Sequence, residues 1–228
     1  MADETIDPQE LTDLAVELHA AESPRATADQ VINYLRDTLE MDHAGVTMIR
    51  AGRQLDTVAA TSEAVTQADA LQQELGEGPC FSDSWDQTLR SGDLTSDVHW
   101  PRWADAVVGL GFKSMLAVAL VHDDRRIGVV CLYSRSPRFF SDDDAALAHL
   151  FARHAAIALA RAEQEAQLGL ALDARKLIGQ AQGILMERFG LDEVRAFEVL
   201  KRYSQNHNLK LRVVAESLVA TRRLPSDP

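Results

Sequence analysis

The chain has 228 residues, of which 46% are hydrophobic and 25% are charged, as in ordinary globular proteins. This length suits one large and one small domain, or two of middling size. The longest apolar run, residues 115–121, is too short for the roughly 20 residues that cross a bilayer, and the acidic N-terminus is unlike a signal peptide. We therefore expect a cytoplasmic protein that does not enter a membrane.

Charge is divided unevenly along the chain, whose net charge is −12. Residues 168–228 contain ten Lys and Arg against seven Asp and Glu and so carry +3, while the rest of the chain carries −15. Such asymmetry indicates a polyanion-binding module attached to one that repels polyanions. An ordinary solvated helical surface explains a charge of +3 equally well, so charge alone leaves both interpretations open.

The first 75 residues predict helix, helix, strand, strand and helix, in that order. Asp7 followed by Pro8 is a favourable helix start. The bend at residues 50–53, between the two strands, contains the glycine that a hairpin favours. The expected ranges are 7–21, 26–41, 44–49, 54–61 and 65–75.

A second pair of strands is expected at 112–121 and 127–133, joined by the polar turn 122–126. Both runs are rich in residues that favour strands, and the turn between them favours an antiparallel hairpin. Because helices flank this antiparallel sheet, the fold class predicted for the region is α+β, with a domain of about 140 residues.

A long helix is predicted from Ser141, whose hydroxyl precedes three acids that favour the positive end of a helix dipole. Residues 145–174 are rich in Ala, Leu and Glu, so one continuous helix is expected to link two domains. A partial heptad seam at three-four spacing favours a homodimer through coiled-coil pairing. Its positions are Leu147, Leu150, His154, Ile157, Arg161, Gln164, Leu168 and Ala171. His154, Arg161 and Gln164 interrupt this seam, and His154 has no second ligand four residues away that would make it a metal ligand.

Three helices are predicted at the C-terminus, where they form a small bundle. The first would bury a face that begins at Leu170 and would end at Gly190, a left-handed stop. Asp192 is expected to cap the second, whose buried face would include Val194. The third would bury one stripe of residues 211–219. A core of this size is marginal unless dimerisation or the long helix supports it.

The bundle also carries a specific sequence pattern. The pattern runs Arg175-x-x-Ile178-x-x-Ala181-Gln182-Gly183-Ile184-Leu185-Met186, then Ala196-Phe197-x-x-Leu200, and closes with Val214-Ala215-x-x-Leu218. Over about 170–224 it resembles the ANTAR family of RNA-binding antitermination domains. The resemblance implies binding to tandem RNA hairpins in nascent transcripts, which prevents a terminator from forming. The family often has Lys at the position of Gln182. The glutamine in this sequence removes one phosphate contact and leaves an amide that could bond to a base.

Side chains that leave the apolar stripes predict the RNA-binding surface. Basic groups bind phosphates, and aromatic or amide groups reach unstacked loop bases. Simple solvation is the alternative for each residue taken alone, and we interpret Gly183 as a place of close helix packing. The predicted RNA-binding residues are Arg175, Lys176, Gln180, Gln182, Arg188, Lys201, Arg202, Tyr203, Ser204 and Lys210.

Four segments ahead of the long helix share a second pattern. They are Leu75-Gly76-Glu77-Gly78-Pro79-Cys80, Trp100-Pro101-Arg102, Leu110-Gly111-Phe112-Lys113-Ser114 and Ile127-Gly128-Val129-Val130. Together they resemble a GAF domain, the partner commonly found ahead of ANTAR. The resemblance implies a helix-flanked antiparallel sheet that can hold a small molecule, which the sequence does not identify.

Residues on loops that would cross one face of this sheet are the candidate ligand-binding residues. The alternative for the tryptophans is packing of loops onto the sheet. A helix start at Cys80 could lower the pKa of its thiol. Catalysis by Cys80 would need a resolving partner, however, and Cys131 lies in a β-run that should be buried. The candidates are Cys80, Trp85, His99, Trp100 and Trp103.

These patterns predict a non-enzymatic regulator in which a sensor domain and a linking helix govern two RNA-binding bundles of a homodimer. The alternative is a DNA-binding one-component transcription regulator with a helix-turn-helix in its last two helices. The sequence has no Gly-rich phosphate loop, paired metal ligands or nucleophile–base motif, so no catalytic residue, metal or cofactor is predicted. The expected domains are an N-terminal helix at 1–26, the GAF-like sensor at 27–162, a helical linker at 163–169 and the ANTAR-like domain at 170–224.

Overall fold

The computed structural model describes residues 23–82 and 88–224. The helix predicted at 7–21 and the candidate Trp85 lie outside these ranges. The chain divides into two compact units, Met1–Gln164 and Glu165–Pro228, each with its own hydrophobic core.

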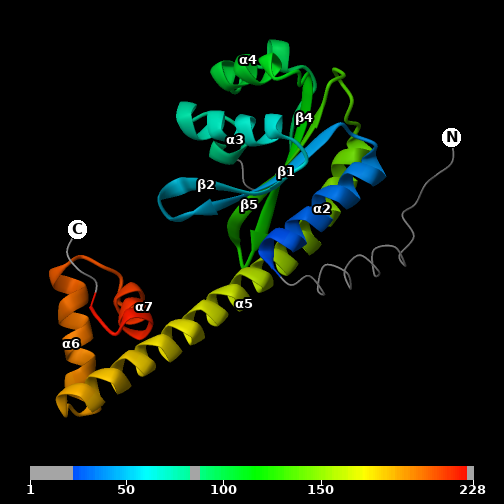
Figure 1. Ribbon diagram of the computed structural model, residues 1–228. Coiled ribbons are helices and arrows are strands. Elements are labelled where there is room, and N and C mark those ends of the chain that lie inside the picture. Colours follow the sequence, from blue (N-terminus) through cyan, green and yellow to red (C-terminus); the bar gives the residue numbers. More distant parts are fainter. Residues whose placement is uncertain (1–22, 83–87, 225–228) are drawn as a thin grey trace. The chain divides into compact units, whose positions relative to one another are not determined.

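The first unit is built on a five-stranded antiparallel sheet (Figure 1). The order of strands across the sheet is β2-β1-β5-β4-β3. The strands span His43–Arg50 (β1), Gln54–Ala60 (β2), Leu89–Ser91 (β3), Ser114–His122 (β4) and Arg125–Ser134 (β5). The sequence predicts all of these except β3, because three residues are too few to show an alternating pattern.

A tight turn joins the two strands of each hairpin in the sheet. β4 and β5 turn at Asp123 and Asp124, which both have left-handed backbone angles (φ 49° and 57°). A two-residue turn of this kind matches the twist of the strands that it connects. β1 and β2 are joined by Ala51–Arg53, in which Gly52 has φ 74°. The hairpin glycine predicted from the sequence is therefore at the turn.

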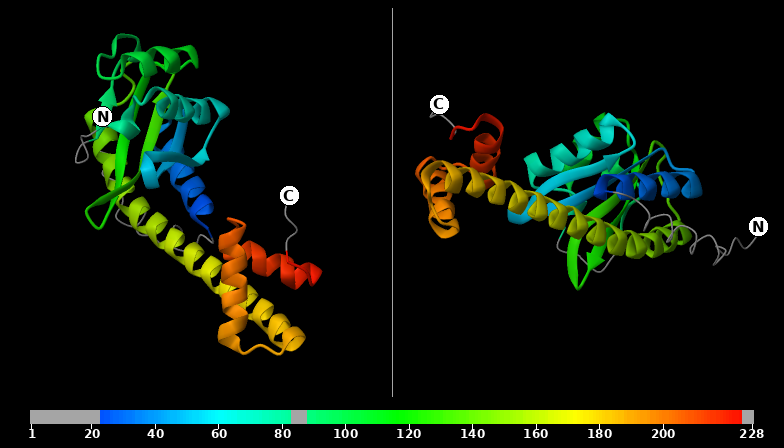
Figure 2. Two further views of the ribbon diagram at one scale, coloured as in Figure 1. Left: turned by 90° about the vertical axis from the view of Figure 1, so that its left-hand side faces the viewer. Right: turned by 60° about the horizontal axis from the view of Figure 1, so that its bottom comes forward.

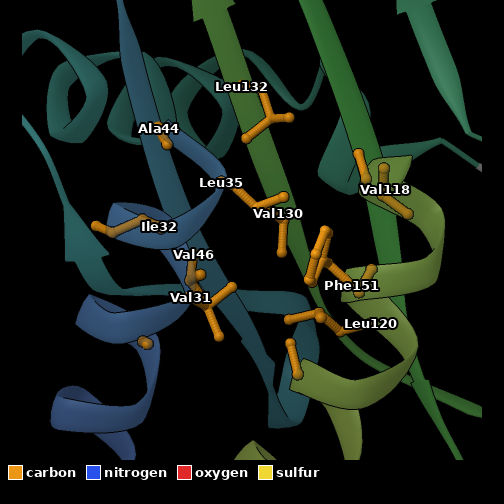
Figure 3. Close-up of a cluster of buried hydrophobic side chains, with 14 of the residues drawn as sticks. Val31, Ile32, Leu35, Ala44, Val46, Val118, Leu120, Val130, Leu132 and Phe151 are labelled. Carbon is orange, nitrogen blue, oxygen red and sulfur yellow. The ribbon is translucent and has the colours of Figure 1, made fainter. Parts of the chain in front are cut away.

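One face of the sheet is covered by α2 (Pro24–Leu39) and the first part of α5 (Asp142–Phe189) (Figure 1). Figure 3 shows Val31 and Leu35 of α2 beside Val130 of β5, with Phe151 of α5 close by. These side chains are almost wholly buried, and the ring of Phe151 lies 4.7 Å from that of Tyr34. This apolar core fixes α2 and the start of α5 on the sheet.

The opposite face is covered by α3 (Glu63–Leu75) and α4 (Pro101–Gly109), together with the short turns η2 (Pro79–Phe81) and η3 (Leu94–Ser96). Trp103, Phe112 and Tyr133 are fully buried in this second core. The sequence pattern indicates α3 but not α4, a nine-residue helix that starts at the proline after Trp100. The architecture is the predicted α+β fold.

The 48-residue helix α5 is unbroken in both views of Figure 2. Its first turn is capped reciprocally, as in a capping box. The backbone N–H of Asp144 donates to Ser141 Oγ at 3.1 Å, and Asp144 Oδ2 accepts from the Ser141 N–H at 2.7 Å. The continuous helix predicted from Ser141 is confirmed.

The second unit is a bundle of the last part of α5 with α6 (Glu193–Asn206) and α7 (Leu211–Thr221). Gly190 ends α5 with φ 62°, and Asp192 caps α6 by accepting from the Arg195 N–H at 2.7 Å, both as predicted. The buried residues of the bundle are Ala181, Leu185, Ala196, Leu200, Val214, Ala215 and Leu218.

Three details predicted for this bundle are wrong. Val194 is 73% exposed, because Ala196 and Leu200 hold the inner face of α6 and a residue two positions earlier points away from it. Leu170 is 56% exposed, ahead of the part of α5 that packs in the bundle. Gly183 is exposed as well, and a methyl group added there would meet no atom within 4 Å, so close helix packing does not explain it.

Candidate nucleic-acid interface and sensor core

The second half of α6 presents two neighbouring cations that the sequence predicts to bind RNA. Lys201 and Arg202 are both exposed. Lys201 Nζ lies 3.5 Å from Glu198 Oε1, but both side chains are about half exposed, at 48% and 52%. A solvated pair of this kind contributes little to stability, so both cations remain available to bind phosphate.

A shallow hollow of about 380 Å³ lies on the surface of α6 beside these cations. Its residues recur at intervals of three and four, so they lie along one side of the helix. Arg202 and Tyr203 were predicted as RNA-binding residues; the ring of Tyr203 stacks on His207, with centroids 4.1 Å apart and planes 25° apart. The hollow is lined by Arg195, Glu198, Val199, Arg202, Tyr203 and Asn206.

Three of the predicted RNA-binding residues donate hydrogen bonds to backbone carbonyl groups of other segments of the bundle. Gln182 Nε2 donates to the carbonyl oxygen of Glu193 at 3.1 Å, which ties α5 to the start of α6. Arg188 Nη1 donates to the carbonyl oxygen of Arg222 at 2.9 Å, at the end of α7. Ser204 Oγ donates to the carbonyl oxygen of Leu209 at 2.5 Å, across the turn between α6 and α7. These three side chains position the helices.

The other predicted residues lie on separate surfaces of the unit. Arg175, Lys176 and Gln180 are exposed on α5, ahead of or among the residues that pack in the bundle. Lys210 is exposed at the first position before α7. The structure thus brings Arg202 and Tyr203 together in one hollow on α6, with Lys201 beside it, and places Arg175, Lys176, Gln180 and Lys210 elsewhere in the unit.

The candidate ligand-binding residues of the first unit do not form one group. Cys80 and Trp103 are buried in the core under α3 and α4, and Trp103 Nε1 donates to the carbonyl oxygen of Ala68 at 3.0 Å. Trp100 is half-buried and meets Trp103 edge to face at 5.9 Å. The side chain of His99 is 75% exposed, with Nδ1 at 3.7 Å from Asp97. Packing therefore explains Trp103 and Cys80, while His99 faces solvent.

A buried carboxylate that the sequence did not reveal lies next to these residues. Asp69 of α3 accepts hydrogen bonds from Thr47 and Thr57, on β1 and β2, and from Gln72 Nε2 at 3.0 Å. Burial raises the pKa of Asp69, and the three donors act in the opposite direction. Gln72 Oε1 also accepts from the backbone N–H of Cys80 at 2.8 Å. One buried network thus connects α3, two strands and η2.

The two thiols lie in the same core and are neighbours. The hydrogen bond with Cys80, together with burial, raises the pKa of the Cys131 thiol well above its usual value. A thiol with a raised pKa forms little thiolate and reacts slowly. This environment disfavours reaction at Cys131.

Two family models match adjacent parts of the chain. The GAF domain model matches residues 21–160, more than half of the chain, and the ANTAR domain model matches residues 166–219. The chain belongs to the GAF–ANTAR family. The helix-flanked sheet is thus the GAF domain, and the helical bundle that carries the α6 hollow is the ANTAR domain.

Solved structures support the fold of the GAF domain. The cyanobacteriochrome TePixJ GAF domain is similar, with a TM-score of 0.52 and 19% identity, over 64% of this chain and 94% of that one. The GAF domain of an Acinetobacter phosphoenolpyruvate-protein phosphotransferase has a TM-score of 0.51 and 12% identity, over 70% of this chain and 97% of that one. The Stigmatella aurantiaca phytochrome photosensory core module has a TM-score of 0.57 and 12% identity, over 94% of this chain and 47% of that one. At these identities the likeness concerns the fold alone. No match was found among curated protein sequences.

Within residues 23–82 and 88–224, no three His, Cys, Asp or Glu side chains are grouped so that they could hold a metal ion. In the same ranges, every helix is too short or too polar to cross a membrane.

Several residues of the α6 hollow were not predicted from the sequence. Arg195, Val199 and Asn206 line the hollow, but only Arg202 and Tyr203 stood out from the sequence. The signal was the spacing from Arg195 to Val199, Arg202 and Asn206, which follows one side of a helix at i, i+4, i+7 and i+11. Asp69 had no such signal, because its partners come from distant strands.

Proposed function

We propose that this GAF–ANTAR protein is an RNA-binding transcription antitermination regulator. Its ANTAR domain binds RNA hairpins in nascent transcripts and prevents terminators from forming, and its GAF domain controls when it does so. The observation that carries this proposal is the surface of α6, where exposed Lys201 lies beside a hollow. Two arginines and a glutamate line this hollow together with aromatic, apolar and amide groups. Cations serve phosphates and the other groups suit unstacked bases.

The exposed side chains of α7 favour RNA over duplex DNA. A helix that reads the major groove needs base-reading side chains along its outward face. The exposed outer residues of α7, the second helix of a would-be helix-turn-helix, include Val213 and Glu216 beside Arg212. A valine and a carboxylate offer little to phosphates or to most base edges, so α7 is a poor recognition helix.

We infer that the protein acts as a homodimer through α5. Ile157 and Leu168 belong to the predicted seam and are 49% and 57% exposed, and Leu172, one turn after Leu168, is 66% exposed. Exposed leucines along a helix are typical of a surface that pairs with another helix. Residues 163–169 are the proposed linker, within an unbroken helix.

The proposed input is a small molecule or a partner recognised by the GAF domain. Of the candidate residues, Cys80 and Trp103 are buried in the core and His99 is exposed. Trp100 is half-buried and lies between His99 and Trp103, so it is the residue that a ligand would contact first. A ligand that stacked on Trp100 would lie next to the buried Trp103 and so affect the packing of α4.

The test is to capture cellular RNA with the purified full-length protein and to sequence it, followed by gel shifts with a captured hairpin and with duplex DNA. We expect enrichment of tandem hairpins upstream of genes and a stronger shift with RNA. Random enrichment, or equal shifts with duplex DNA at the same ionic strength, would contradict the proposal.

A further inference from the structure

The hollow on α6 differs from a simple phosphate site in its chemistry. Arg195 and Arg202 supply two guanidinium groups, but Glu198 stands between them along the helix and Val199 adds an exposed apolar side chain. A carboxylate repels phosphate, and an apolar group gains nothing from it. The hollow therefore suits a ligand that is flat, largely apolar on its faces and polar at its edges.

An unpaired nucleobase has these properties. Its faces stack on aromatic rings and on planar guanidinium groups, and its edges carry both donors and acceptors. Tyr203, with its ring held against His207, and Val199 offer the faces a surface, while Arg195 and Arg202 lie on either side. The amide of Asn206 and the carboxylate of Glu198 can bond to a base edge.

We propose that the hollow lined by Arg195, Glu198, Val199, Arg202, Tyr203 and Asn206 receives a single unpaired base from the loop of the bound RNA. This proposal rests on the proposed RNA-binding function and assigns its base-recognition site to α6. Lys201 lies outside the hollow and is left to bind the phosphates next to that base. The volume, about 380 Å³, lies at the lower end of the range for small-molecule sites of roughly 300–1,000 Å³.

The test uses the full-length protein and a pool of RNA hairpins with a constant stem and a randomised loop. The best-bound hairpin is then made with one abasic nucleotide at each loop position in turn. For the wild-type protein, we expect removal of one particular base to weaken binding about tenfold, the loss of one stacked base. The other abasic positions should have smaller effects.

The matched variants are Val199→Trp, which fills the hollow, and Val194→Trp, which puts the same side chain on an exposed position of α6 outside it. We expect Val199→Trp to bind the intact hairpin about tenfold more weakly than the wild type does, with no further loss on the abasic hairpin. Val194→Trp should behave as the wild type. Circular dichroism melting would verify that both variants fold.

The outcomes separate this inference from the function on which it rests. If the wild-type protein binds no hairpin of the pool at low salt, the RNA-binding function itself is wrong. If hairpins bind but the penalty of the abasic nucleotide persists in Val199→Trp, or if both tryptophan variants bind alike, the base site is not in this hollow. Altered self-association of Val199→Trp without a change in RNA affinity would instead assign the hollow to a contact between protein copies.

Discussion

Arg50, the last residue of β1, donates two hydrogen bonds to Glu163 of α5, from Nη1 to Oε2 at 2.7 Å and from Nη2 to Oε1 at 2.9 Å. The same guanidinium binds Asp56 of β2 at 2.9 and 2.7 Å. The bonds to Glu163, the largest influence, hold the pKa of Arg50 above its ordinary value. Glu163 is the penultimate residue of the first unit, so this pair fixes α5 to the sheet just before the ANTAR domain begins.

Breaking this pair should loosen the end of the GAF domain. We expect Arg50→Met to lower the free energy of unfolding by about 1 kcal/mol, because Glu163, only 19% exposed, loses its partner. Arg36→Met is the matched control, since Arg36 and its partner Asp37 are 40% and 70% exposed; its effect should stay below about 0.5 kcal/mol. Urea denaturation measures both effects. Equal losses of stability would mean that the pair of Arg50 with Glu163 stabilises the protein no more than an exposed ion pair does.

The buried carboxyl of Asp69 should make stability depend on pH. Its pKa is raised in the folded protein, so the folded state holds this proton more tightly than the unfolded chain does. Asp69 therefore contributes most to the free energy of unfolding below the ordinary carboxyl pKa of about 3.9. This contribution falls as the pH rises through the pKa that Asp69 has in the folded protein. We expect the stability difference between the wild type and Asp69→Ala to be larger at pH 4 than at pH 7.

The control for this prediction is Asp105→Ala, on an exposed position of α4. Its stability difference from the wild type should be within about 0.5 kcal/mol at both pH values. A gap for Asp69→Ala that grows from pH 4 to pH 7 would show that the hydrogen bonds from Thr47, Thr57 and Gln72 outweigh burial.

The cations of α6 should determine how RNA binding depends on salt. Replacing Lys201 and Arg202 together by alanine should reduce the slope of log affinity against log salt concentration by about 1 to 2, as expected for the loss of two phosphate contacts. Alanine at Arg25 and Arg36 removes the same charge from the exposed surface of α2 and should leave the slope unchanged. A salt titration in which the two double variants agree would exclude the α6 cations from the RNA surface.

Gly183 of α5 and Gly190, the residue that follows this helix, should respond to alanine in opposite ways. Gly183 lies within the helix, and an added methyl group has open space around it, so Gly183→Ala should raise the free energy of unfolding by about 0.5–1 kcal/mol. Gly190 ends the helix with φ 62°, so Gly190→Ala should lower it by about 1 kcal/mol. Thermal unfolding of the two variants tests this contrast. Destabilisation by Gly183→Ala would point to a close neighbour at that face, such as a second copy of α5.

The sequence predicted those elements whose signals are local. The Asp192 cap, the Gly190 stop and the hairpin of β4 and β5 all depend on residues close together in the chain, and all are present. The prediction that Val194 is buried was wrong, because the sequence does not show which side of an apolar helix the bundle covers. The burial of Asp69 depends on contacts between α3 and distant strands, which one sequence does not contain.

The double use of Gln72 has a consequence for the dynamics of the GAF domain. Its amide group holds both the Cys80 backbone and Asp69, and Asp69 in turn holds Thr47 of β1 and Thr57 of β2. Because no member can move away without leaving a buried polar group unsatisfied, we expect η2, α3 and these strands to open together. Amide hydrogen exchange should then find a single cooperative unit that includes β1. The last residue of this strand, Arg50, binds Glu163 of α5, the helix that continues into the ANTAR domain.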